Sequence, residues 1–334
     1  MTDPGGDSSE PVPQTIPRSS LVNLIKKFLL LAVLAVVFWQ LMTLGRQIDW
    51  SQMRLRPGWL IAAVGTYLAG WLPCVWYWRK LIILQGVTVP WHVVLRSHYC
   101  GQLGKYIPGK AAALLIRGEM VRPWGVPLLA GVMTAGFESL ATMAVGGAVA
   151  VSLAPFVLTQ EQWAHLGLPD MKLTGLQGII VGLLLIVTLL LIPLLTHVMN
   201  LVLRRIVSKV VKNEPALREV RPPHWAFLAL TLTWWLHGLS LGCTIEAVGL
   251  DLPLLANWPR WTAAASLGTV IGFVVLFAPG GAGVREGVLL TLLQGELGPQ
   301  AALVVVLLRI VWLISELSTA GILFLIPRLF PSKV

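Results

Sequence analysis

Charge is the scarcest feature of this sequence, since only 12% of its 334 residues are Asp, Glu, Lys or Arg. A soluble domain averages about 25% charged residues, so the composition argues against an ordinary soluble fold. Cysteine is also scarce, because Cys74, Cys100 and Cys243 show neither a CxxC spacing nor a disulfide framework. The sequence lacks a P-loop, an Asp-rich metal motif and a nucleophile–base pair. We therefore expect no cofactor, no metal ion and no enzymatic centre.

Hydrophobic residues, in contrast, make up 56% of the chain, and the mean hydropathy is +0.77. Apolar runs of about 17 to 28 residues, long enough to cross a bilayer core, recur along the sequence. They cover residues 28–44, 58–78, 126–153, 175–198, 225–249, 258–278 and 300–326. The pattern predicts an all-α polytopic membrane protein with about seven to eight transmembrane helices and two re-entrant or broken helical hairpins.

Composition divides the chain into three regions. Residues 1–22 are rich in Pro, Ser, Gly and Asp, and we expect them to form a disordered tail. Residues 23–328 should form a single transmembrane domain, because the apolar runs follow one another almost without interruption. Residues 329–334 remain as a short C-terminal tail.

The net charge of +10 is carried by loops rather than by a soluble basic domain. It indicates contact with anionic lipid headgroups and argues against a nucleic-acid partner. The pair Lys26 and Lys27, together with the basic loop 199–223, places the N-terminus on the cytoplasmic side of a cell membrane. The loop 45–57 is basic as well and opposes this orientation.

Tryptophan is abundant, with fifteen residues. Many of them lie near the ends of predicted spans, Trp78 and Trp261 among them. Because tryptophan is enriched at membrane–water interfaces, we expect these side chains to form an aromatic belt.

The segment 277–287 (FAPGGAGVREG) interrupts the apolar sequence with one proline, four glycines and an adjacent Arg-Glu pair. Irregular backbone at membrane depth must be shielded from lipid, because its N–H and C=O groups find no partner there. Ionisable side chains at that depth are costly and usually functional. The segment therefore predicts a polar cavity inside the protein. Its candidate binding residues are Pro279, Gly280, Gly281, Gly283, Arg285 and Glu286.

A second break lies at residues 106–109 (YIPG), within a semi-polar stretch. The aromatic-x-Pro-Gly pattern recurs at 277–280, and transporters often pair two broken segments around a midplane site. With only four matched positions, a true structural repeat and a chance similarity are equally compatible with the two patterns. A half-helix that starts after either break would offer free N–H groups to a phosphate, whereas the lysines nearby could instead snorkel to the interface. The candidate binding residues here are Lys105, Pro108, Gly109, Lys110, Arg117 and Glu119.

Three more candidates, Glu138, Arg309 and Glu316, are charged residues inside predicted spans. A lone carboxylate in hydrocarbon is expensive, so each side chain must face the bundle interior. Arg309 and Glu316 lie seven residues apart and share nearly the same helix face. We expect their partners at Arg285 and Glu286. Two interpretations stay open: ion pairs that hold the bundle together, and a headgroup cavity that includes a proton-carrying carboxylate.

Three weaker signals concern single residues or pairs. His237 lies in mid-span and fits a packing histidine better than a proton relay. Gly268 and Gly272 form a GxxxG pattern, which predicts close helix packing. His165 and Asp170 show a His-x4-Asp spacing that we attribute to chance.

The segment 277–287, the short apolar stretch after it and a last span carrying Arg309 resemble the C-terminal signature of a known family. That family is the flippase-like membrane domain of lysylphosphatidylglycerol synthases, with its stand-alone relatives. Residues 101–110 together with Arg117 resemble the family's first broken segment, and Glu138 resembles the glutamate of its next helix. The resemblance covers roughly residues 25–327.

The resemblance implies a transporter that moves an anionic or lipid-linked, polar-headed lipid between membrane leaflets. The sequence ends at Val334, so we expect no aminoacyl-transfer domain and no lipid lysylation. Lys110 stands where many relatives have a smaller or acidic residue, which bears on headgroup preference. Two alternatives are a membrane-embedded enzyme acting on lipid or polyprenyl phosphates, and a non-catalytic partner of an envelope-lipid enzyme. The expected partners are the lipid, a second copy in a homodimer, or such an enzyme.

Overall fold

The computed structural model describes residues 55–106, 111–157, 225–275, 279–281 and 283–329, with residues 183, 197, 198, 200 and 201. Every regular element in this part of the chain is a helix, which confirms the all-α prediction. Several sequence predictions concern residues outside these ranges, namely the tail 1–22, the span 28–44, most of the span 175–198, His165, Asp170, Pro108, Gly109 and Lys110.

Four helical segments in the described part are long and apolar enough to cross a membrane. They are Pro57–Leu84, Leu128–Ala154, Trp225–Ala247 and Gln300–Leu325. They confirm the predicted spans at 58–78, 126–153, 225–249 and 300–326. The first comprises α2 (Pro57–Gly70) and α3 (Leu72–Leu84), and the others belong to α6 (Leu128–Val157), α9 (Trp225–Ala247) and α12 (Gln300–Leu329).

The two breaks lie between pairs of shorter helices. The first follows α4 (Trp91–Gln102) and the short 3-10 helix η2 (Leu103–Tyr106), and it precedes α5 (Ala111–Val121). The second lies between α10 (Leu254–Val274), the helix of the predicted span 258–278, and α11 (Val284–Leu297). Within it, η4 (Pro279–Gly281) forms one tight turn. Irregular backbone therefore occurs at the second Pro-Gly pattern, as predicted, whereas residues 107–110 of the first lie outside the described ranges.

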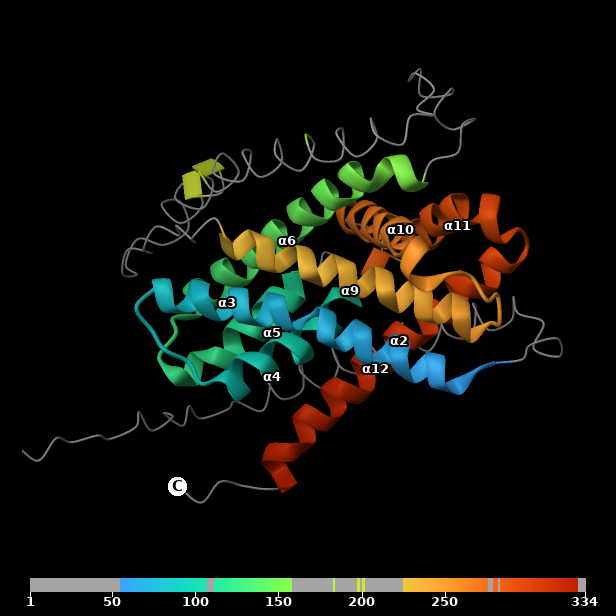
Figure 1. Cartoon of the computed structure of the whole chain (residues 1–334). Coiled ribbons are helices and arrows are strands. Elements are labelled where there is room, and N and C mark those ends of the chain that lie inside the picture. Colours follow the sequence, from blue (N-terminus) through green and yellow to red (C-terminus); the bar gives the residue numbers. More distant parts are fainter. Residues whose placement is uncertain are drawn as a thin grey trace, which may run out of the picture.

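Helix α9 lies at the centre of the bundle, where it packs against α2, α3, α6, α10 and α12. Figure 1 shows α2 and α3 following one another along one side of α9, with α6 and α10 on its other side. On one flank of the bundle, α5 packs against α6 and α4 packs against α12. Helix α11 packs against both α10 and α12. Both breaks therefore lie next to α12.

Glycines allow the helices to approach closely, as small residues do in membrane bundles. A Cβ added at Gly268 would lie 3.1 Å from Cγ of Leu289, and one at Gly272 would lie 3.1 Å from Cβ of Arg285. The GxxxG pattern on α10 thus packs against α11, which confirms the prediction of close helix packing.

Two tryptophans that were assigned to the aromatic belt are buried instead. Trp78 and Trp261 are both 0% exposed. The indole of Trp78 donates a hydrogen bond to Oγ1 of Thr134 at 3.1 Å, and the ring of Trp261 fills the space that a side chain at Gly242 would need. The belt prediction is wrong for these two residues, because position near a span end does not distinguish the bundle interior from the lipid face.

An exposed ion pair outside the spans connects the start of α2 to the link between α9 and α10. Nη1 of Arg56 donates to Oδ1 of Asp251 at 2.5 Å, and Nη2 donates to Oδ2 at 3.0 Å. These hydrogen bonds lower the pKa of Asp251 and raise the pKa of Arg56. The contribution of the pair to stability is therefore present at neutral pH and is lost as the pH falls through the lowered pKa of Asp251.

The substitution Gly238→Ala should destabilise the bundle, because its Cβ would lie 2.7 Å from the backbone N of Thr262 on α10. Backbone cannot move aside as a side-chain end can, so we expect a loss of about 1–3 kcal/mol. The matched control is Gly65→Ala on α2, whose Cβ would meet nothing within 4 Å. Thermal unfolding midpoints of the detergent-solubilised variants measure the difference, and equal midpoints would contradict this packing.

Candidate functional site

A cavity of about 360 Å³ lies within the bundle and is lined by residues that flank the first break and by residues of the second. This volume is at the low end of the roughly 300–1,000 Å³ typical of small-molecule sites. Among the candidates from the sequence, the lining includes Lys105, Arg117, Glu138, Gly280, Gly281 and Arg285. In the described part of the chain, no three His, Cys, Asp or Glu side chains converge as metal ligands would.

The two breaks meet where Tyr106 packs against Gly280. A Cβ at Gly280 would lie 2.7 Å from Cε1 of the Tyr106 ring. Gly280 and Gly281 also have φ values of 60° and 72°, in the left-handed region that favours glycine. Glycine is therefore required at Gly280 both for the turn and for the approach of the first break.

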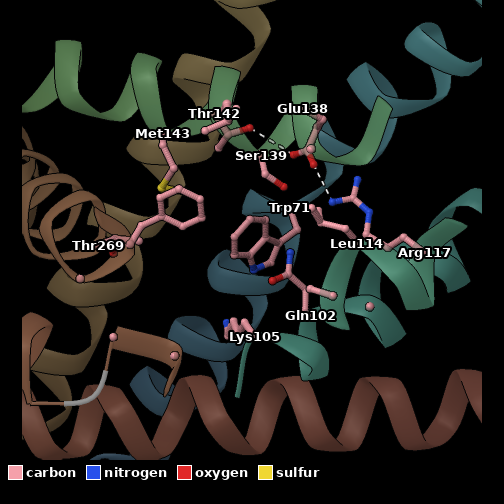
Figure 2. Close-up of a pocket in the computed structure, with 18 of the residues that line it drawn as sticks. Trp71, Gln102, Lys105, Leu114, Arg117, Glu138, Ser139, Thr142, Met143 and Thr269 are labelled. Carbon is pink, nitrogen blue, oxygen red and sulfur yellow. Dashed lines mark hydrogen bonds and ion pairs between the residues drawn. The ribbon is translucent and has the colours of Figure 1, made fainter. Parts of the chain in front are cut away.

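Glu138 on α6 forms a buried ion pair with Arg117 on α5. Nη1 of Arg117 lies 2.7 Å from Oε2 of Glu138, and Oγ1 of Thr142 donates to Oε1 at 3.1 Å. Figure 2 shows these two contacts at one side of the cavity, with Trp71 near its middle. The Arg117 guanidinium also lies 4.2 Å from the centre of the Trp78 ring. Both charged groups are almost fully buried, so each depends on the other for its counter-charge.

Glu316 on α12 accepts hydrogen bonds from three side chains. Nζ of Lys105 donates at 2.5 Å, the hydroxyl of Tyr106 donates at 2.8 Å, and the hydroxyl of Tyr67 also donates. These contacts join α12 to η2 and to α2. The sequence pointed to Arg285 as a partner for Glu316, but Lys105 takes that place because η2 brings its ammonium to the carboxylate.

Glu286, in the Arg-Glu pair of the second break, both caps a helix and balances the charge of two arginines. The Glu286 carboxylate accepts a hydrogen bond from the N–H of Gly283 at 2.7 Å, which caps the start of α11. Its other oxygen lies 3.5 Å from Nε of Arg309 and 3.5 Å from Nη2 of Arg285. Arg309 also donates to the carbonyl of Gly280 at 3.2 Å. The structure thus confirms Glu286 as the partner of Arg309.

Some of the predicted site residues lie apart from the cavity. Glu119 has a side chain that is 43% exposed, and it pairs with Arg122 at 3.5 Å on the outside of α5. Gly283 is exposed as well, and Pro279 begins the η4 turn. Glu286, Arg309 and Glu316 belong to the charged network but do not line the cavity themselves.

The sequence interpretation missed an aromatic group on the cavity wall. Tyr67 stacks on Trp312 with ring centres 4.6 Å apart, and Trp71 meets His237 at 4.9 Å. All four side chains line the cavity, and His237 packs among the aromatic rings there, as expected for a packing histidine. Helix periodicity could have revealed Trp312, because it lies three residues after Arg309 and four before Glu316. No comparable signal marked Tyr67 in α2 or Trp71 directly after it.

Comparison with known families gives one match over most of the chain. The family model described as lysylphosphatidylglycerol synthase TM region matches residues 25–315. The matched range includes both breaks and ends one residue before Glu316. A comparison with curated proteins gave no match.

The substitution Glu138→Ala should cost about 3–5 kcal/mol of stability, because it leaves the buried Arg117 without its counter-charge. The matched control is Glu119→Ala, which removes an exposed partner and should cost about 1 kcal/mol or less. The double variant Arg117→Met with Glu138→Met should recover most of the loss, since no charge is then left unpaired. Thermal unfolding midpoints in detergent measure all three. A Glu138→Ala midpoint equal to that of Glu119→Ala would refute the buried pair.

Proposed function

This chain belongs to the family of the lysylphosphatidylglycerol synthase TM region, and we propose that it moves a polar-headed lipid between the leaflets of a cell membrane. The headgroup would occupy the cavity between the two breaks while the acyl chains stay in the bilayer. One observation carries the proposal: a cavity within a bundle of membrane-length helices is lined by the basic side chains of Lys105, Arg117 and Arg285.

The charge balance around the cavity favours an anionic headgroup. Four basic side chains face three carboxylates in the described part of the site. The basic residues are Lys105, Arg117, Arg285 and Arg309, and the acidic ones are Glu138, Glu286 and Glu316. The excess of one positive charge in a poorly hydrated site attracts a phosphate and repels a net cation.

Arg285 is the cation best placed to contact a phosphate. It is 6% exposed and lines the cavity. Its interactions with the described residues are the 3.5 Å approach to Glu286 and a position 4.8 Å from the centre of the Trp312 ring. Neither is a hydrogen bond, so most of the donors of its guanidinium are available to a ligand.

The cavity reaches the protein surface beside the N-terminal end of α5 and the middle of α6. Ala111 on α5 and Leu140 on α6 both line the cavity and are exposed, with Leu140 48% exposed. The same cavity reaches the buried Arg117. A headgroup could therefore enter beside Ala111 and Leu140, where the cavity meets the exposed surface.

In this proposal the two breaks form re-entrant hairpins whose irregular backbone faces the cavity rather than lipid. The positive-inside rule places the N-terminus in the cytoplasm. Because the sequence has no P-loop, movement follows a gradient or equilibrates the leaflets.

Arg285→Gln should slow lipid movement by roughly tenfold or more, the value of one lost charge-assisted hydrogen bond. The assay uses proteoliposomes that contain an anionic phospholipid with a fluorescent acyl chain, and a membrane-impermeant quencher reports the label in the outer leaflet. The matched control is Arg122→Gln, which removes the same charge from the surface outside the cavity. Arg285→Lys keeps the charge and should recover part of the rate.

The wild-type protein should exchange the label faster than protein-free vesicles do. Lipid movement would be refuted if the folded wild-type protein exchanged the label no faster than protein-free vesicles do, for several headgroups. The thermal unfolding midpoint shows that the protein is folded. Equal rates for Arg285→Gln and Arg122→Gln would refute the role of the cavity.

A further inference from the structure

His98 on α4 lies next to the carboxylate of Glu138 in the interior of the bundle. His98 is 0% exposed, and its Nε2 lies 3.8 Å from Oε1 of Glu138. Neither ring nitrogen of His98 forms a hydrogen bond with the residues that the structure describes. Histidine is the side chain that changes its charge near neutral pH, and one proton would turn these two groups into an ion pair. The pair is therefore a place where the interior can hold a proton.

The charged and titratable groups around His98 and Glu138 come from α3, α4, η2 and α5. They are Cys74 and Tyr77 on α3, Tyr99 on α4, Lys105 on η2 and Arg117 on α5. On α12, which also packs against α4, Glu316 is paired with Lys105. Cysteine and tyrosine are uncharged near neutral pH. Since Lys105 is balanced by Glu316, the charge that acts most directly on the pair is that of Arg117.

Glu138 and Arg117 line the cavity, so this proton site lies at its wall. Nη1 of Arg117 lies 2.7 Å from Oε2 of Glu138, and Figure 2 shows the two side chains pointing towards one another at one side of the cavity. Leu140, two residues after Glu138, is 48% exposed and lines the cavity as well. A headgroup that enters beside Leu140 therefore comes close to this ion pair.

The positive charges of the cavity are not evenly balanced. Arg285 and Arg309 share the carboxylate of Glu286, so the second break carries an excess positive charge. Arg117, in contrast, is balanced by Glu138. A phosphate that approaches Arg117 also approaches this carboxylate, and like charges repel strongly where water is scarce. The phosphate would leave a net negative charge in a buried place, which is costly.

One proton removes this obstacle. With a proton held between His98 and Glu138, these two groups and Arg117 together carry one positive charge, which matches the single negative charge of a phosphodiester. We propose that His98 and Glu138 form a proton-binding site coupled to Arg117, so that an anionic headgroup takes up one proton when it binds there. The proton comes from water and returns to water when the phosphate leaves.

The coupling works in both directions. The anion raises the affinity of the pair for a proton, and the proton raises the affinity of the cavity for the anion by the same factor. This inference rests on the proposed function, because it concerns the same cavity, and it names the ion that accompanies the headgroup.

Isothermal titration calorimetry tests the coupling with the full chain in micelles of a neutral detergent. The probe is short-chain phosphatidylethanol, a phosphodiester whose one charge does not titrate near neutral pH. We expect its affinity to rise by up to about tenfold for each unit by which the pH falls, the limit for uptake of one proton. The binding heat should also depend on the ionisation heat of the buffer, because the buffer supplies the proton. Titrations into protein-free micelles give the background.

The outcomes distinguish the proton site from lipid movement itself. Binding whose affinity does not change with pH, and whose heat does not change with the buffer, would overturn the inference and leave the proposed function intact. Affinity that falls as the pH falls would contradict the direction of the coupling. Absence of binding in a protein that still exchanges labelled lipid in proteoliposomes would overturn the inference alone. Absence of both binding and exchange would overturn the proposed function as well.

Two variants assign the proton to the pair. Glu138→Gln has the shape of the carboxyl group but no charge, so it should bind the probe tightly at every pH and take up no proton. His98→Gln should reduce proton uptake near neutral pH, because an amide does not titrate. The matched control is His92→Gln, which replaces an exposed histidine on the same helix and should keep the full uptake.

Thermal unfolding midpoints show whether each variant is folded. Proton uptake equal to that of the wild type in both folded variants would overturn the assignment to His98 and Glu138. If neither variant folds, the titration of the wild-type protein still decides whether the anion binds together with a proton.

Discussion

Glu316 holds the first break in place, because Lys105, Tyr106 and Tyr67 all donate to its carboxylate. A charge buried at this depth needs its partners, so α2, η2 and α12 cannot separate without exposing it. Tyr106, fixed in this way, packs against Gly280 and sets the position of the second break. One carboxylate thus joins elements beside the cavity that lie far apart in the sequence.

The second break combines support and chemistry in adjacent residues. Glu286 caps α11 through the N–H of Gly283 and also approaches Arg309, so it serves the helix and the charge balance together. Arg285 packs against α10 and Trp312, and it lines the cavity with an ion pair to Glu286 at 3.5 Å. A break of this kind costs regular hydrogen bonds, and the caps and buried ion pairs compensate for them.

Sequence periodicity and turn chemistry were enough to predict the described spans, the second break and the contact between Arg309 and Glu286. The pairing of Lys105 with Glu316 could not be predicted, because 211 residues separate them and no local rule connects them. The spacing could have excluded Glu119 from the site. Glu119 follows Arg117 by two residues, or about 200° of helix rotation, so the two side chains cannot share a helix face. In the sequence, Tyr67 and Trp71 cannot be distinguished from other membrane aromatics, and only the structure shows that they line the cavity.

A headgroup inside the cavity is the central claim, and photo-crosslinking tests it most directly. The probe is phosphatidylglycerol with a diazirine on its headgroup, activated in proteoliposomes and mapped by mass spectrometry of peptides. The account predicts labels on residues around Trp71, Leu114 and His237, which excess unlabelled phosphatidylglycerol removes. Labels confined to exposed lipid-facing positions such as Ile61 and Leu228, and unaffected by competitor, would contradict it.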